Sequence, residues 1–157
     1  MRTAAQTDNT PVVSPALEFC FRLTRAYASM TRRLDNALGS FHGLSFADFM
    51  VLANLSRAPG GRQRRIDLAE RLGLTASGIT RALIPLEKIG LVKRQADTRD
   101  ARVGYAVLTA AGEKLLANAM ASAELVSDEA VQAASHKQLE TLSSVLGQLA
   151  GMNASNS

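Results

Sequence analysis

The fold is decided by residues 66–94, IDLAERLGLTASGITRALIPLEKIGLVKR. We expect a short helix over 67–72 that ends at Leu72-Gly73, because glycine takes the left-handed conformation that a tight turn needs. Thr75 is placed to cap a second helix over 76–89. The apolar side chains that can close a small core between these helices are Leu68, Ala69, Leu72, Ile79, Leu83, Leu86 and Ile89. Two short helices joined by a glycine-containing turn predict a helix-turn-helix.

The start of the second helix carries side chains that fit the major groove of DNA. Ser77, Thr80 and Arg81 can form hydrogen bonds to base edges or phosphates, and Thr75 lies beside them at the cap. Pro85 lies further along this helix and has no N–H for the carbonyl of Arg81, so we expect a kink in the last turn. The N-terminal turns remain available to bind DNA.

After this block the apolar pattern changes from helical spacing to alternation. Residues 91–95 predict a strand, and residues 103–109 predict its hairpin partner. The side chains expected on one face of the second strand are Val103, Tyr105 and Val107. A hairpin directly after a DNA-binding helix is a wing. Its charged link, 96–101, places Arg99 near the tip, where a guanidinium group can enter a minor groove and meet its negative potential.

The residues before the block predict two further helices. Apolar residues recur at three- or four-residue spacing over 16–38, and Gly39 then Gly43 end this helix. Ser45 is a suitable N-cap for the second helix, and Pro59-Gly60-Gly61 breaks it. Its expected apolar face consists of Phe46, Phe49, Met50, Ala53 and Leu55. A short extended stretch over 62–65 follows.

The residues after the wing predict a long helix over 110–133, capped by Thr109, and a last helix over 136–150. The apolar side chains of the last helix are Leu139, Leu142, Val145, Leu146 and Leu149. We expect residues 1–14 to be a disordered arm and residues 151–157 a flexible tail. The fold class is therefore mainly α with a small β-wing: a winged helix-turn-helix between flanking helices.

Charge is concentrated in one part of the chain. The 157 residues carry a net charge of +4, yet Arg57–Arg102 hold 11 of the 18 Lys and Arg residues and only 5 of the 14 acidic residues. Such a block is either a solvated surface or the footprint of a polyanion. Arg62, Arg64 and Arg65 can contact phosphates, or can form ion pairs with Asp67 and Glu70. Arg64 and Arg65 are the candidate phosphate contacts of this group.

Composition and motifs exclude several classes of protein. Cys20 is the only cysteine, so there is no internal disulfide and no zinc ligand cluster. We find no signal peptide or membrane span and expect a cytoplasmic protein. No set of nucleophile, base and acid, no P-loop, no dinucleotide fingerprint and no HExxH motif is present, so we expect neither an enzyme nor a cofactor. A winged-helix module that binds proteins instead of DNA is the alternative; it predicts a neutral or acidic helix face.

Residues 44–116 resemble the multiple-antibiotic-resistance regulator (MarR) family of bacterial repressors. The specific part is GLVKR followed by D-x-R-D-x-R and LTxxG; the flanking helices also match in length and order. The resemblance implies one domain over 15–150, in which 45–109 form the DNA-binding lobe, and 16–38 and 110–150 form the dimerisation helices. It also implies a homodimer that binds double-stranded DNA at a pseudopalindromic operator and acts as a repressor.

The resemblance also implies roles for the wing residues. Arg99 would enter the minor groove, while Asp97 and Arg102 would steady the wing and its contacts with the DNA backbone. The family usually carries an arginine where this chain has Ala101, so one phosphate contact is expected to be missing.

Two kinds of signal remain open. The resemblance places a ligand cleft between the linker of the first two helices and the DNA-binding lobe, where a small aromatic anion or phenol could bind. The residues that could line it are Tyr27, Met30, His42, Phe46 and Met50, although His42 could equally be an exposed loop residue. The alternative is a peroxide sensor that uses Cys20, but the nearest basic residue is Arg22 and a buried, inert thiol is the simpler interpretation.

Overall fold

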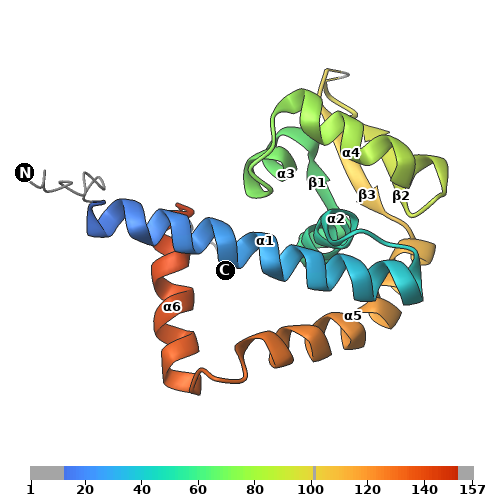
Figure 1. Ribbon diagram of the computed structural model, residues 1–157. Coiled ribbons are helices and arrows are strands. Elements are labelled where there is room, and N and C mark those ends of the chain that lie inside the picture. Colours follow the sequence, from blue (N-terminus) through green and yellow to red (C-terminus); the bar gives the residue numbers. More distant parts are fainter. Residues whose placement is uncertain (1–12, 101, 152–157) are drawn as a thin grey trace, which may run out of the picture.

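The computed structural model describes residues 13–100 and 102–151 of the chain, which form a mainly helical protein with one small sheet (Figure 1). In this part of the chain the helices are α1 (Pro15–His42), α2 (Phe46–Arg57), the short 3₁₀ helix η1 (Pro59–Gly61), α3 (Arg65–Arg71), α4 (Ala76–Lys88), α5 (Ala110–Val131) and α6 (His136–Leu149). The strands are β1 (Arg62–Arg64), β2 (Val92–Ala96) and β3 (Gly104–Leu108). The expected mainly α fold with a β-wing is confirmed. Residues 1–12 and 152–157, most of the predicted arm and tail, lie outside the described residues.

Helix α1 is four residues longer at its C-terminal end than the sequence pattern predicted. Gly39 lies inside the helix, and Gly43, with φ 66°, ends it. Gly43 can end it because its N–H donates to the Gly39 carbonyl, the N–H of Leu44 donates to the Leu38 carbonyl, and the Leu44 side chain is buried. A single glycine only lowers helix propensity and does not by itself stop a helix.

The helix-turn-helix is formed by α3 and α4, as expected. Thr75 caps α4 by accepting the N–H of Gly78 at 3.0 Å, and Gly73 takes φ 64° in the turn. Of the expected core residues, Leu68, Ala69, Ile79, Leu83 and Leu86 are buried and Leu72 is half-buried. The expectation for Ile89 is wrong, because this side chain is 64% exposed. The helix ends at Lys88, and Leu91 fills the core instead, with its N–H bonded to the Leu86 carbonyl.

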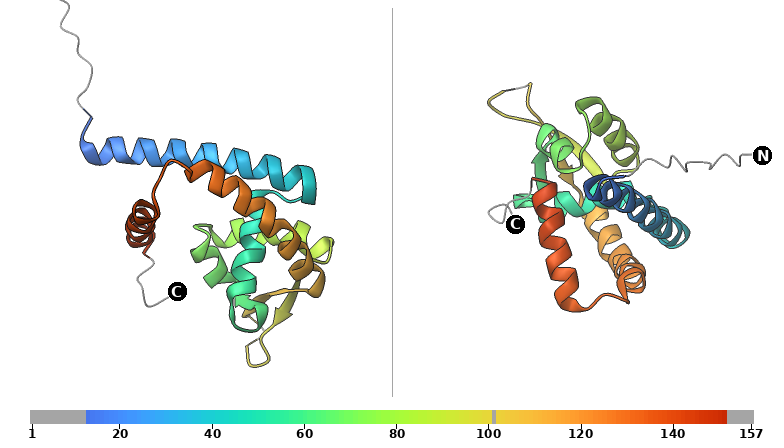
Figure 2. Two further views of the ribbon diagram at one scale, coloured as in Figure 1. Left: turned by 90° about the horizontal axis from the view of Figure 1, so that it is seen from below. Right: turned by 60° about the vertical axis from the view of Figure 1, so that its left-hand side comes forward.

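The wing is the β2–β3 hairpin, and the sheet has the order β1-β3-β2, with both pairs antiparallel. Ala106 and Leu108 of β3 face the core and are buried. Tyr105 and Val107 alternate with them, so they lie on the other face and are half-buried. The hairpin projects away from the rest of the lobe (Figure 2).

The remaining helices form a layer beside the lobe. Helices α1 and α5 run along one another, and α6 lies at the end of the molecule that is away from the wing (Figures 1 and 2). The core residues that α1 and α5 supply are Leu34, Leu38, Leu116, Ala119 and Ala123. By contrast, α6 contains no buried residue. Among the described residues, no helix is both long enough and apolar enough to cross a membrane.

Candidate nucleic-acid interface

The first turns of α4 are exposed. Ser77, Thr80 and Arg81 all point to solvent, although two of the hydroxyl groups also form local bonds. The Thr80 hydroxyl donates to the Ala76 carbonyl at 2.9 Å, and the Ser77 hydroxyl lies 3.2 Å from that of Thr75. The Thr75 side-chain oxygen accepts the N–H of Gly78 in the helix cap, and the Thr80 hydroxyl donates to a backbone carbonyl. Ser77 and Arg81 are therefore the side chains that are freer to form hydrogen bonds with a partner. The helix continues past Pro85 to Lys88, so this proline does not break it.

The carboxylate of Asp97 organises the tip of the wing. Its Oδ1 accepts the backbone N–H of Arg99 at 2.7 Å and that of Asp100 at 3.2 Å. These bonds lower the pKa of Asp97, because they favour its charged form. The N–H of Asp97 in turn donates to the Val103 carbonyl at 2.9 Å. Arg99 is therefore held in a defined turn with its side chain exposed.

Hydrogen bonds also join Arg102 to the carboxylate of Asp100. Arg102 donates to Asp100 Oδ1 from its backbone N–H at 3.0 Å and from Nε at 3.1 Å. This contact lowers the pKa of Asp100. Sequence reasoning gave roles to Asp97 and Arg102 and missed Asp100, although the D-x-R-D-x-R motif contains it. Ala101, the position at which the family's arginine and its phosphate contact are expected to be missing, lies outside the described residues.

A pocket of about 420 Å³, here called the inner pocket, lies between the start of α3, the start of α4 and the wing. Four arginines from these elements line it: Arg64, Arg65, Arg94 and Arg102. Thr80 also lines it, while Ile66, Ile79 and Val103 supply apolar surface. The fold thus gathers four of the predicted DNA contacts, Arg64, Arg65, Thr80 and Arg102, in one place. Arg94 was missed, although the GLVKR motif contains it.

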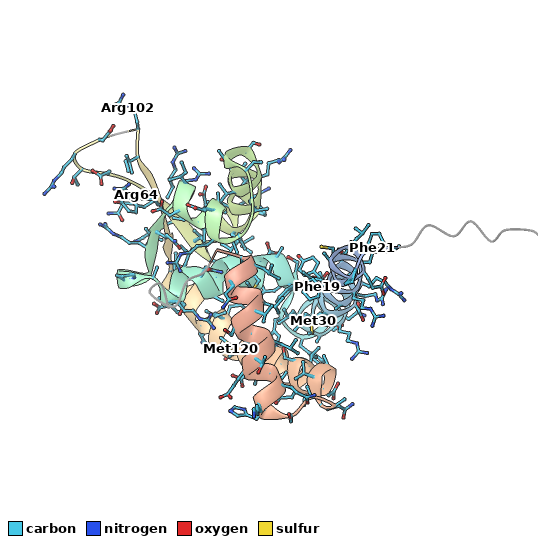
Figure 3. All side chains as sticks on the ribbon, turned by 90° about the vertical axis from the view of Figure 1, so that its left-hand side faces the viewer. Phe19, Phe21, Met30, Arg64, Arg102 and Met120 are labelled. Carbon is cyan, nitrogen blue, oxygen red and sulfur yellow. The ribbon has the colours of Figure 1, made fainter. Side chains whose placement is uncertain are left out.

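The arginines of β1 and α3 are not neutralised by neighbouring carboxylates. Within residues 13–100 and 102–151, neither Arg62, Arg64 nor Arg65 lies within 4 Å of an acidic side chain. The alternative of ion pairs with Asp67 and Glu70 is therefore not observed. Arg64 and Arg102 lie at the end of the molecule that is distant from Phe19 and Phe21 of α1 (Figure 3). Among the described residues, Arg62, Arg64 and Arg65 thus add unpaired positive charge to the winged lobe.

The residues predicted to line a ligand cleft are spread over α1 and α2. Met30 and Phe46 pack against the core, and Met50 is half-buried. Tyr27 is 64% exposed. The alternative that His42 is an exposed loop residue is wrong: it is the last residue of α1, is half-buried, and its Nε2 is hydrogen-bonded to the Ser122 hydroxyl of α5 at 2.9 Å. None of these five residues lines the inner pocket.

Cys20 is exposed on α1, so the interpretation of a buried thiol is wrong for this chain. It lies too early in α1 to pack against the lobe, since the buried residues of this helix are Leu34 and Leu38. No group of three or more potential metal ligands occurs in the described part of the chain.

The comparisons with known proteins agree on one family. Residues 44–103 match the MarR family model. The HTH-type transcriptional regulator MhqR of Bacillus subtilis (strain 168) is 28% identical over 139 residues, which cover 88% of this chain and 93% of MhqR.

Solved structures of that family share the fold. A MarR family transcriptional regulator from Streptomyces coelicolor, solved in complex with DNA, has a TM-score of 0.79 at 24% identity, with 91% of each chain covered. CouR from Rhodococcus jostii RHA1, bound to p-coumaroyl-CoA, has a TM-score of 0.78 at 20% identity, with 88% of this chain and 96% of CouR covered. The family match spans the helix-turn-helix and most of the wing, so residues 44–103 form a MarR-type winged helix-turn-helix, and most of the chain is similar to DNA-binding transcriptional regulators.

Proposed function

We propose that the protein is a homodimeric repressor that binds a pseudopalindromic operator in the cytoplasm. The observation that carries this proposal is the inner pocket, where the exposed start of α4 and four arginines of β1, α3 and the wing meet on one surface. Arginines that lie beside a helix able to enter the major groove can neutralise the flanking phosphates. The same surface disfavours the protein-binding module, which predicts a neutral or acidic face.

Each part of this surface has its own role in the proposal. Ser77, Thr80 and Arg81 contact base edges, and Thr75 holds the first turn of α4 in shape. Arg99 enters the minor groove from a turn that Asp97 organises. The phosphate contacts come from Arg64, Arg65 and Arg102.

The second copy of the chain is assigned to the apolar faces of α1 and α6. Since α6 buries no residue within its own chain, its apolar side chains need another surface. The exposed ones are Leu142, Val145, Leu146 and Leu149. The first half of α1 exposes Leu17, Phe19, Phe21 and Leu23 in the same way. A twofold dimer through these helices would present two copies of α4, which suits a pseudopalindrome.

Binding to DNA is tested by fluorescence anisotropy with the DNA upstream of the gene. Arg81→Ala should weaken binding by about 1–3 kcal/mol and relax the base preference. Arg99→Ala should weaken binding most on sites with narrow, A·T-rich flanks. Arg25→Ala, an exposed arginine on α1, is the matched control and should bind like the wild type. Unchanged affinity for both Arg81→Ala and Arg99→Ala would overturn the proposal.

The proposed signal is a small aromatic acid or phenol that binds near Tyr27, Met30, His42, Phe46 and Met50. The support is that Met30, His42, Phe46 and Met50 are half-buried and include one imidazole, and that a protein of the same fold, CouR, is bound to p-coumaroyl-CoA. The two DNA-binding lobes of the dimer can be spaced so that they fit the operator or so that they do not. A ligand would release the operator only to the extent that it binds the second conformation more tightly than the first. The exposure of Cys20 favours a second candidate, a thiol-based peroxide sensor.

The two signals are separated by a DNA-release assay on the wild type and Cys20→Ser. We expect aromatic acids to release DNA from both proteins. Release by an organic hydroperoxide from the wild type alone, with every aromatic acid inactive, would replace the ligand proposal with redox sensing.

A further inference from the structure

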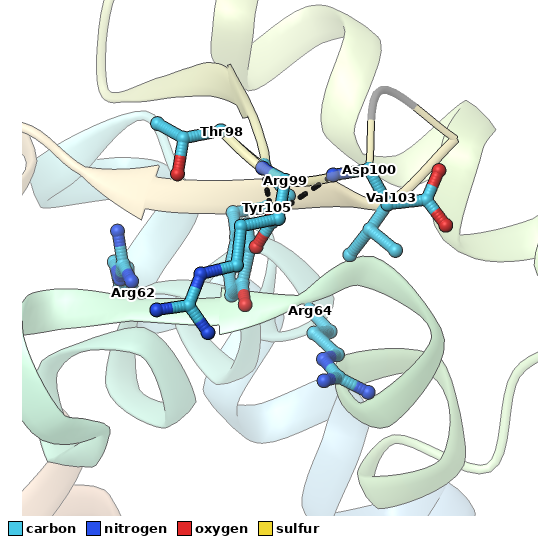
Figure 4. A pocket seen from close by; sticks show the side chains of 8 residues that line it. Arg62, Arg64, Thr98, Arg99, Asp100, Val103 and Tyr105 are labelled. Atoms are coloured by element: carbon cyan, nitrogen blue, oxygen red, sulfur yellow. Dashed lines mark hydrogen bonds between the residues drawn. The ribbon is translucent and has the colours of Figure 1, made fainter.

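A second pocket, here called the outer pocket, lies on the face of the wing sheet that points away from the core. Its volume is about 580 Å³, and Arg62, Arg64, Asp97, Arg99 and Tyr105 are among the residues that line it (Figure 4). The register of the sheet explains why. Arg64 pairs with Tyr105 and Arg62 with Val107, so these side chains lie on one face, opposite to buried Ala106 and Leu108.

Tyr105 orders the cations around it. The guanidinium carbon of Arg62 lies 4.7 Å from the centre of the Tyr105 ring, which is the geometry of a cation–π contact. The Tyr105 hydroxyl raises the pKa of Arg64, its partner across the strands. The Arg62 side chain thus does not sample solvent as freely as a single surface side chain does.

The charge in the outer pocket is unbalanced. Three guanidinium groups face it, and two carboxylates line it. Both carboxylates already have donors: Asp97 accepts two backbone N–H groups of the wing tip, and Asp100 accepts Arg102. Among the described residues, Arg62, Arg64 and Arg99 form no ion pair within 4 Å. The pocket therefore carries an excess of one positive charge, and within the described part of the chain its three guanidinium groups form no ion pair within 4 Å.

We propose that the outer pocket binds an oxyanion, and that this oxyanion is a phosphodiester of the DNA flank beyond the bases that α4 contacts. The proposal rests on the proposed function, because it needs the wing to enter a minor groove. A minor groove is about 6 Å wide and has a phosphate backbone on each side. A wing inserted there has one backbone against each face of its sheet. The inner pocket faces one backbone, and Arg62 and Arg99 of the outer pocket face the other, while Arg64 lines both pockets.

The assignment makes Arg62 a DNA-binding residue and Tyr105 a positioning residue. Arg62 is exposed, so Arg62→Ala should fold like the wild type. Losing one phosphate contact should lower the slope of log K against log salt by about one, which corresponds to about eightfold weaker binding at 0.1 M salt. Tyr105→Leu removes the ring and should weaken binding in the same way, whereas Tyr105→Phe retains the ring and should restore most of the affinity.

The test compares two operator duplexes, one that ends at the last base pair near α4 and one extended by several base pairs beyond the wing. Arg62→Ala should weaken binding to the extended duplex and leave binding to the short duplex unchanged, with Arg25→Ala as the matched control. Equal affinity of wild type and Arg62→Ala for both duplexes would overturn the proposal. If Arg81→Ala still weakened binding in that case, the proposed function would stand; if it did not, both would fail.

A free oxyanion is the other source of the same chemistry. Inorganic phosphate is titrated at constant ionic strength, without DNA, against wild type and Arg62→Ala, and followed by shifts of the Arg64 guanidinium resonance, which both proteins have. We expect no saturation up to millimolar phosphate. Saturable binding lost in Arg62→Ala, together with no effect of the flank length, would assign the outer pocket to a free anion and overturn the DNA assignment.

Discussion

At the scale of single residues, two carboxylates hold the tip of the wing. The pKa of Asp97 and that of Asp100 both lie below the ordinary value of 3.8, because Asp97 accepts two backbone N–H groups and Asp100 accepts Arg102. A carboxyl group with a lowered pKa stabilises the folded state above its ordinary pKa, and this contribution is lost as the pH falls through the lowered value. The wing turn should therefore keep its order throughout the physiological range.

This expectation is checked by following the amide resonances of Arg99 and Asp100 during a pH titration. They should be constant from pH 8 to pH 5 and change only below 3.8. Asp97→Ala should remove the order at neutral pH, speed the hydrogen exchange of both amides and weaken DNA binding. Thr98→Ala, in the same turn, is the control. A titration midpoint above 3.8 would contradict the assigned bonds.

At the scale of elements, Thr109 and Gly112 connect the segment that follows α4 to α5. The Thr109 hydroxyl lies 2.6 Å from the Gly90 carbonyl and 3.0 Å from that of Leu91, and it accepts the N–H of Gly112. A Cβ atom at position 112 would lie 2.2 Å from the Leu91 carbonyl oxygen, which is too close for any side chain. The end of α4 and the start of α5 are thus packed backbone to backbone.

Gly112→Ala should destabilise the protein by about 1–3 kcal/mol, because the two backbones must separate. Gly39→Ala is the matched control: position 39 lies inside α1, and the nearest atom to an added Cβ atom is the Leu44 carbonyl oxygen at 3.9 Å. This change should stabilise the protein by about 0.5–1 kcal/mol. Urea unfolding measures both. A neutral Gly112→Ala would show that the close packing has room to relax.

The elements were largely predictable from the sequence, because caps, turns and apolar spacing are local signals. Thr75, Ser45 and Thr109 cap helices as expected. The failures were at positions where a distant contact decides. Gly39 did not end α1 because Leu44 and His42 find partners only when the helix continues to residue 42. Likewise, whether Ile89 or Leu91 fills the core depends on where the following strand begins.

The candidate site was predictable only in part, for the same reason. The residues at the start of α4 are neighbours in the chain, and so are the residues at the tip of the wing. Each group therefore forms a motif that is visible in the sequence. The stacking of Arg62 on Tyr105 is not, because these residues are far apart in the chain and meet through the register of β1 with β3. No local pattern fixes that register.

At the scale of the whole molecule, the proposal of a dimer depends on α6. Leu142→Glu combined with Leu146→Glu places two charges on the exposed apolar face of this helix. If a second copy covers that face, sedimentation should show monomer or aggregate in place of dimer, because buried unpaired carboxylates are costly. DNA affinity should fall as well, since two linked α4 helices bind two half-sites more tightly than one does. Ser143→Glu with Gln148→Glu is the control on the same helix. A monomer that still binds the operator tightly would contradict the dimer proposal.

The order of the sheet has a consequence for solubility. Because β3 is the central strand, both β1 and β2 are edge strands, whose unpaired N–H and C=O groups can attract a strand of another molecule. Strand β1 is only three residues long and exposes Arg62 and Arg64, and β2 exposes Lys93 and Arg94. Like charges on both edges repel a second copy of the same strand. We therefore expect the cations that the proposal assigns to DNA phosphates also to oppose edge-to-edge aggregation when no DNA is bound.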